Sequence, residues 1–147
     1  NKQPCGCPGM QAKKLERTPA AEPAGTVPGQ LSNWPVQIKL VPVQAPYFAD
    51  ADLLVAADCT AFAYGNFHAE FIRNRITIIG CPKIDGVDYA EKLGAIFAQN
   101  SIRSITVTRM QVPCCGGLEA AVRRAIAESG KEIPLSVVTI SADGRIL

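Results

Sequence analysis

The stretch ADLLVAAD, residues 51–58, decides the fold of this chain of 147 residues. It is a short apolar run, and a strand with apolar side chains on both faces is typical of a parallel sheet that helices cover on both sides. ITIIG at 76–80 and SITVT at 104–108 have the same character, and LSVVTI at 135–140 closes the series. These runs predict strands that lie side by side in one sheet.

Helical patterns separate the predicted strands. Residues 88–100 place Tyr89, Leu93, Ile96 and Phe97 on one helical face, and Asn100 is suited to cap the C-terminal end. Residues 116–129 form the next predicted helix, which Gly130 ends, and Asn66 begins a shorter one. The alternation predicts a three-layer α/β fold of Rossmann-like or flavodoxin-like type. Its mainly parallel sheet would have about four to five strands, with helices on both faces.

The chain divides into two parts. Residues 1–33 are a Pro-rich N-terminal tail without apolar periodicity, and residues 34–147 are the predicted α/β domain. The domain opens on alternating apolar residues at 36–40, typical of a half-exposed strand. Pro35 and Pro42 confine that segment to a sheet edge or make it extended coil.

The composition excludes several classes of function. The net charge is only +2 and the basic residues are scattered, which argues against nucleic acid as the partner. No apolar run approaches the roughly 18 residues of a membrane helix, and the N-terminus lacks the apolar core of a signal peptide. No nucleotide-binding motif follows a strand. We therefore expect a cytoplasmic protein without a membrane span.

The chain has six cysteines, and four of them follow predicted strands. These are Cys59, Cys81, Cys114 and Cys115. Because the loops that follow parallel strands meet at one sheet edge, we expect the four thiols to lie close together. Thiolates are soft ligands that select zinc, copper(I) and iron–sulfur clusters. The leading prediction is one [4Fe-4S] cluster with these four cysteines as its ligands.

Cys5 and Cys7 lie in the CGCPG motif of the tail and are further candidate ligands. They would either replace one of the four strand-end cysteines or hold a second centre, which leaves a second or larger cluster open. Disulfides and ordinary buried thiols are the competing explanations. The chain is long enough for a full core, and neighbouring cysteines make poor disulfide partners, so we favour a metal centre.

Four other positions have predicted roles at this centre. Gly116 and Gly117 follow the cysteine pair and would let backbone N–H groups approach a cofactor at a helix N-terminus. Arg109 is a candidate to balance the charge of a cluster. His68, the only histidine, is either a helix-surface residue or a further ligand beside Cys59.

Two alternatives to electron transfer remain open. One is an oxidoreductase that uses the cluster, or the vicinal pair Cys114-Cys115, on a small substrate. The other is a zinc-stabilised interaction module, although the CxxC spacing common in zinc sites does not occur.

Several motifs together resemble the C-terminal domain of the 4Fe-4S ferredoxin-type iron–sulfur proteins of anaerobic bacteria and archaea. They are WPVQIKLVPVQAPYF, ADLLVAADC, FHAEF, IIGCPKID and VPCCGGLEAAV, and CGCPG resembles the link that follows the ferredoxin module of those proteins. The resemblance implies an iron–sulfur redox protein whose partner is another redox protein or a ferredoxin module; a homo-oligomer is also open. The two-cluster module with its CxxCxxCxxxCP motif is missing, so it was either removed or never present.

Overall fold

The computed structural model describes residues 10–17 and 25–147, so the predictions for Cys5 and Cys7 lie outside the described residues. Four parallel strands form one sheet in the order β2-β1-β3-β4. Their bounds are β1 Asp52–Ala57, β2 Ile76–Gly80, β3 Ser104–Met110 and β4 Leu135–Ile140. The predicted α/β fold with a parallel sheet is confirmed.

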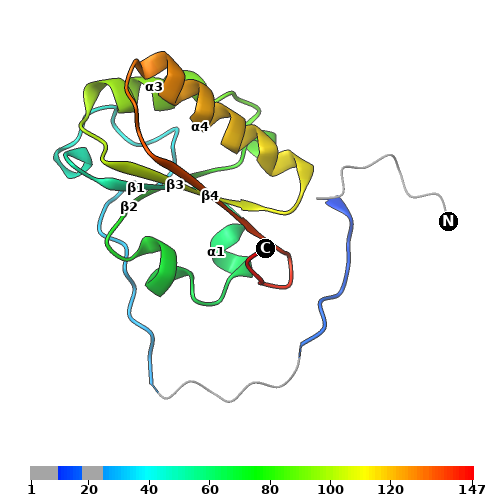
Figure 1. The fold of residues 1–147 in the computed structure, drawn as a ribbon. Coiled ribbons are helices and arrows are strands. Elements are labelled where there is room, and N and C mark those ends of the chain that lie inside the picture. The colour runs from blue at the N-terminus through cyan, green and yellow to red at the C-terminus, as the bar shows by residue number, and fades with distance from the viewer. Residues whose placement is uncertain (1–9, 18–24) are drawn as a thin grey trace.

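Helices cover both faces of this sheet, which gives three layers (Figure 1). The helices α3 (Ala90–Gln99) and α4 (Gly116–Ser129) pack against each other on one face. The other face carries α1 (Thr60–Ala63) and the π-helical turn η3 (His68–Ile72). Three shorter elements complete the fold: η2 Pro46–Phe48, α2 Pro82–Asp85 and η4 Pro113–Cys115. No helix in the described part of the chain is long and apolar enough to cross a membrane.

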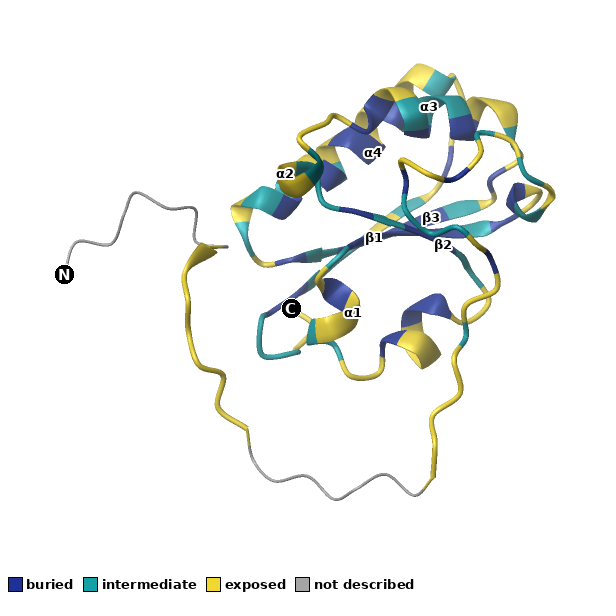
Figure 2. Ribbon diagram, turned by 180° about the vertical axis from the view of Figure 1, so that it is seen from behind, coloured by how far each residue is buried: buried dark blue, intermediate teal, exposed yellow. Residues whose placement is uncertain are grey.

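The core lies on both sides of β1, the strand that the sequence marks as apolar on both faces. Leu53, Leu54 and Val55 are each fully buried although successive side chains point to opposite faces. Figure 2 shows buried residues in the central strands and along the inner sides of α3 and α4. Burial of one such side chain stabilises the fold by about 1.5–3 kcal/mol, so β1 anchors both helical layers.

The helix predicted at 88–100 is shorter than expected, because Asp88 and Tyr89 precede its first turn. It begins at Ala90, whose N–H donates to the Asp88 carboxylate at 3.0 Å. At its other end, the Asn100 amide donates to the Ile96 carbonyl at 2.8 Å and to the Val43 carbonyl at 2.7 Å. Asn100 therefore caps the helix as predicted, and it also fastens the helix to the preceding loop.

The segment 36–40, predicted as an edge strand or extended coil, makes a single bridge to β2 at Gln37 and then turns, because the N–H groups of Leu40 and Val41 donate to the Gln37 carbonyl. The bridge is flanked by hydrogen bonds from Ile79 N–H to the Val36 carbonyl at 2.8 Å and from Ile38 N–H to the Ile79 carbonyl at 2.9 Å. It covers the outer edge of β2, which would otherwise present unpaired backbone groups.

The side chain of Asn33 extends this protection of β2. Its amide donates to the Thr77 carbonyl at 2.9 Å, and its Oδ1 accepts from the Thr77 N–H at 2.9 Å. One buried side chain thereby replaces a pair of strand–strand hydrogen bonds at a point where Pro35 removes a backbone donor.

Candidate functional site

The strand order places the four strand-end cysteines around the point where the order reverses. β1 has β2 on one side and β3 on the other, and ligands of such sheets bind at the carboxyl ends of the strands there. Cys59 follows β1, Cys81 follows β2, and Cys114 and Cys115 lie in η4 after β3. We call this side of the molecule, defined by these four residues, the cysteine edge.

The four thiols differ in exposure and influence one another electrostatically. Cys59 is exposed, Cys81 and Cys114 are half-buried, and Cys115 is buried. Desolvation raises the pKa of the Cys59 thiol, and negative charge at Cys81, Asp58 and Cys114 raises it further. Burial raises the pKa of Cys115 to about 11, with smaller contributions from Cys114 and Cys59. Each added thiolate therefore makes the next one harder to form.

The side chains of the described residues do not form a ready site for a single metal ion, because no three Cys, His, Asp or Glu converge closely enough. A tetrahedral zinc site needs four ligands around one atom, about 2.3 Å from each sulfur. A four-iron cluster distributes its thiolate ligands around a larger body. The cysteines supply sulfur, the donor type that a cluster takes, from three loops on one side of the sheet, but they form no metal-holding group in the described part of the chain.

Tyr89 supports the loop that carries Cys81. The Cys81 N–H donates to the Tyr89 hydroxyl at 3.1 Å, and that hydroxyl donates to the Asp85 carboxylate. The Asp85 N–H donates back to the Cys81 carbonyl at 2.9 Å. Burial and the neighbouring Asp85 hold the pKa of Tyr89 well above its usual range. The phenol therefore stays protonated and links the two ends of α2.

Sequence reasoning assigned Tyr89 only to the buried face of a helix. The one local signal of its position is Gly80, because a Cβ added there would lie 2.7 Å from the Tyr89 hydroxyl oxygen. A glycine directly before a strand-end cysteine is consistent with close approach by a bulky side chain.

Arg109 places a positive charge beside the turn that carries Cys114 and Cys115. Its guanidinium pairs with Glu119 at 3.1 Å and donates to the Val112 carbonyl at 3.4 Å. A Cβ added at Gly116 would lie 3.8 Å from two guanidinium nitrogens. The Arg109 guanidinium therefore lies at the N-terminus of α4, where Glu119 balances its charge, and its predicted role beside a cluster stays a prediction.

Gly117 brings two cysteine loops together. A Cβ added there would lie 3.6 Å from the Pro82 side chain, so the first turn of α4 packs against the residue that follows Cys81. This is an ordinary contact distance, so no described neighbour requires glycine at 117. The predicted role of Gly116 and Gly117, which is to let a cofactor approach the backbone, stays a prediction.

Asp58 precedes Cys59 and carries a buried oxygen at the same edge. Its backbone N–H donates to the Gly80 carbonyl at 3.1 Å, while its carboxylate Oδ1 has no partner among the described residues. Burial and the charge of Asp85 raise the pKa of this carboxyl.

His68 lies in η3, where it fastens the N-terminal segment to the domain. Its Nδ1 accepts a hydrogen bond from the Gln30 N–H at 3.0 Å. One ring nitrogen is thus occupied by the polypeptide itself, which favours the helix-surface interpretation of this residue over metal ligation.

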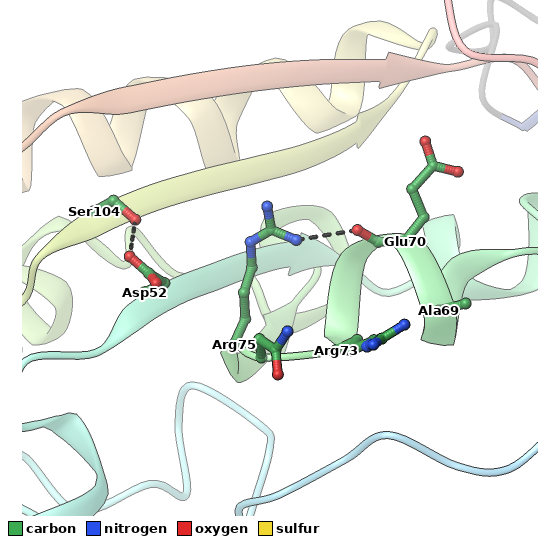
Figure 3. A pocket seen from close by; sticks show the side chains of 7 residues that line it. Asp52, Ala69, Glu70, Arg73, Arg75 and Ser104 are labelled. Atoms are coloured by element: carbon green, nitrogen blue, oxygen red, sulfur yellow. Dashed lines mark hydrogen bonds between the residues drawn. The ribbon is translucent and has the colours of Figure 1, made fainter.

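A polar cavity of about 530 Å³ opens at the opposite, amino edge of the sheet (Figure 3). Several of its polar groups are bonded within the lining: Ser104 donates to Asp52 at 2.7 Å, and Arg75 donates to the Glu70 carbonyl at 3.1 Å. The lining mixes acidic and basic residues and contains no cysteine. We therefore interpret this cavity as a structural feature of the amino end of the sheet.

The fold and the strand-end site define a class of protein: a parallel α/β domain with its candidate site at the switch point. The chain belongs to the Rossmann-like domain family, which matches residues 45–147. An uncharacterized protein of Archaeoglobus fulgidus is 30% identical over 118 residues, which cover 80% of this chain and 83% of the relative. No solved structure matches the chain.

Proposed function

We propose that this protein binds an iron–sulfur cluster at the cysteine edge and transfers electrons in a reducing cytoplasm. The observation that carries the proposal is the arrival of four thiols from three separate loops at the switch point of one parallel sheet. Cys59, Cys81, Cys114 and Cys115 are the proposed ligands of one [4Fe-4S] cluster. Such a cluster accepts and releases one electron.

Two features of the chain support this assignment. The four strand-end cysteines are free thiols, and sulfur is the ligand atom that iron–sulfur clusters take. The N-terminus of α4, with Gly116 and Gly117, presents backbone N–H groups and the positive end of a helix dipole beside Cys115. The half-buried Arg109 lies at the same place, where Glu119 balances its charge. The backbone N–H groups and the helix dipole would stabilise an anionic centre.

Thiol chemistry at the vicinal pair is less well supported. A reactive cysteine has a depressed pKa and an accessible sulfur, whereas Cys115 is buried and its pKa is raised to about 11. We therefore place electron transfer ahead of an oxidoreductase that uses Cys114-Cys115 as a dithiol.

The test is anaerobic purification of the full chain with iron and acid-labile sulfide analysis, followed by EPR after reduction. We expect about four iron and four sulfide per chain and a broad brown absorption band. Serine in place of Cys59, Cys81, Cys114 or Cys115 should lower the iron content or destabilise the cluster. Met110→Leu is a matched control, since it removes a sulfur near the same loop without removing a thiolate.

Two results would overturn the proposal. One is a colourless protein that takes up no iron during anaerobic reconstitution. The other is one zinc per chain without sulfide, which would assign the cysteines to the interaction module. Replacement of both Cys5 and Cys7 by serine tests whether these two residues are ligands. Unchanged iron content would show that the four strand-end cysteines suffice.

A further inference from the structure

The two edge strands of the sheet differ in how the chain covers them. The outer edge of β2 is covered by the bridge at Gln37 and by the side chain of Asn33. β4, the strand at the other edge, has no neighbour along most of its outer side in the described part of the chain (Figure 1). An uncovered edge presents backbone N–H and C=O groups that pair readily with another extended chain.

The hydrogen bonds to β3 show which backbone groups of β4 point outward. The Ile105 N–H donates to the Pro134 carbonyl at 2.9 Å, directly before β4. Bonds to one neighbouring strand come from every second residue, so the even-numbered residues of β4 bond toward β3. The odd-numbered residues Leu135, Val137 and Thr139 therefore direct their N–H and C=O groups to the outer side.

Residues 145–147 return along β4 and cover one end of this outer side. The Leu147 N–H donates to the Thr139 carbonyl at 2.9 Å, and the Ser141 N–H donates to the Arg145 carbonyl at 2.9 Å. The stretch from Leu135 to Val137 stays open, because the outward groups of these two residues have no partner among residues 10–17 and 25–147.

The side chains of this stretch do not prevent pairing. Proteins commonly protect an edge strand with a charged side chain, a proline within the strand or a bulge. Residues 133–142 contain no charged residue, and Pro134 precedes β4 without interrupting it. A contact about a two-fold axis places residues beside their own copies, where a charged side chain would repel itself. An uncharged strand is therefore compatible with a second copy of this chain.

Two exposed apolar side chains border the open stretch. Ile146 is 44% exposed and Leu147 is 59% exposed. Both lie beside β4, because Ile146 bridges Ile140 and Leu147 bonds to Thr139. Apolar surface next to open backbone groups favours a protein partner at this edge.

We propose that two copies of this chain pair through the outer edge of β4, antiparallel and about a two-fold axis at Ser136. In this register Leu135 lies opposite Val137 of the second copy, and the reverse pair forms at the same time. Each pair exchanges N–H···O=C bonds, so the open groups of both strands are satisfied. An axis at Val137 would instead require Thr139, whose carbonyl already accepts from Leu147.

The side-chain directions agree with this register. The hydroxyls of Thr60 in α1 and Thr108 in β3 are 3.1 Å apart, so Thr108 points to the α1 face of the sheet, and Ser136 points the same way because it pairs with Thr106. Successive side chains alternate, so the half-buried Leu135 and Val137 point to the α4 face. Across the axis they would form two apolar cross-strand pairs.

Antiparallel pairing also fixes the direction of the two cysteine edges. The strands of the second copy run opposite to those of the first, so the carboxyl ends of the two sheets face opposite directions. Each cysteine edge then lies at its own end of the joined sheet, and neither copy contributes a thiol to the other. The pairing therefore does not depend on the proposed function.

Analytical ultracentrifugation of the full chain under reducing conditions tests the pairing. We expect a species of twice the 15.6 kDa chain mass that dissociates on dilution. Ser136→Glu places two carboxylates together at the axis and should raise the dissociation constant of the dimer at least about tenfold. Ser32→Glu is the matched control, because Ser32 is also exposed and lies beside Asn33, which covers the opposite edge of the sheet.

A charge exchange distinguishes a second copy from a strand of another protein. Ser136→Lys should weaken the dimer as Ser136→Glu does. An equimolar mixture of the two variants should restore the two-chain species, because opposite charges then meet at the axis. Ser136 is exposed in the single chain, so both variants should keep the circular dichroism spectrum of the unsubstituted protein.

Amide hydrogen exchange locates the contact. The Leu135 and Val137 amides should be protected in the unsubstituted dimer and exchange faster in Ser136→Glu, whereas the Ser136 amide, which bonds toward β3, should change little. A chain that stays monomeric at about 1 mM, a dimer that Ser136→Glu leaves unchanged, or a mixture that does not reassociate would each overturn the proposal. The first of these results would leave the edge to a strand of another protein.

Discussion

At the scale of single residues, Tyr89 is the side chain that most directly organises the site. It is 2% exposed, yet its hydroxyl reaches the backbone of Cys81 and the carboxylate of Asp85. Sequence periodicity placed it correctly on the buried side of a helix. It did not reveal the contact with Cys81, because that contact depends on how α3 packs over the end of β2.

Removal of the Tyr89 hydroxyl should destabilise the Cys81 loop. In Tyr89→Phe the Cys81 N–H loses its acceptor and Asp85 loses its donor, so we expect a loss of about 1–3 kcal/mol in the free energy of unfolding. Urea denaturation measures the loss, and hydrogen exchange at the Cys81 amide should speed up. Unchanged stability and exchange would show that water replaces the hydroxyl without cost.

Tyr47 offers the matched control for this substitution. Its hydroxyl is buried without a hydrogen-bond partner among the described residues, and burial raises its pKa. Tyr47→Phe removes an unsatisfied polar atom and should be neutral or slightly stabilising. The two phenylalanine variants delete the same atom and differ only in whether that atom is bonded.

At the scale of elements, β2 and the N-terminal end of α3 are packed tightly, because a Cβ added at Gly80 would lie 2.7 Å from the Tyr89 hydroxyl oxygen.

The helix 116–129 and the strand 135–140 have the bounds that periodicity predicts, since their patterns are long and end at clear signals such as Gly130. The stretch after Asn66 is different: a π-helical turn at 68–72 replaces the expected short helix. Packing of Phe71 under the sheet determines that turn more than local propensity does.

Gly80→Ala tests how tightly β2 and α3 are packed. The added Cβ would lie 2.7 Å from the hydroxyl oxygen and 2.8 Å from Cζ of Tyr89, so the ring has to move. We expect a loss of about 1–3 kcal/mol in thermal or urea unfolding, together with weaker protection of the Cys81 amide. Gly65→Ala, where nothing lies within 4 Å of the added atom, should cost little. Equal effects of the two substitutions would contradict this account.

At the scale of the whole molecule, the amino edge of the sheet contributes to stability and the carboxyl edge carries the candidate chemistry. Asp52 at the start of β1 pairs with Arg103 and accepts from Ser104 at the start of β3. Hydrogen bonds from Arg103 and Ser104 lower the pKa of Asp52 to about 2. These contacts join the two central strands far from the cysteines.

The lowered pKa of Asp52 predicts how stability depends on pH. A carboxyl with a depressed folded-state pKa stabilises the fold above its ordinary pKa of 3.8, and this contribution is lost as pH falls toward about 2. Since Arg103 is 67% exposed and screened by solvent, Asp52→Asn should cost only about 1 kcal/mol at neutral pH.

Urea denaturation at a series of pH values measures this dependence. The difference between Asp52→Asn and the unsubstituted protein should shrink below about pH 4 and vanish only as pH falls through about 2. Glu132→Gln is the control, because Glu132 is exposed and makes no ion pair among the described residues. A difference that persists at the lowest pH would assign the effect to the Ser104 hydrogen bond and not to charge.

The sequence by itself determined the alternation of strands and helices, the parallel sheet, and the position of four cysteines after strands. These follow from local periodicity and from the handedness of strand–helix–strand connections, which depend on residues near one another in the chain. Only the tertiary structure decided the order β2-β1-β3-β4, the contact of Tyr89 with Cys81, and the exposure of Phe62 and Ile84. Such features depend on which surfaces meet after the layers pack, and no local pattern encodes that choice.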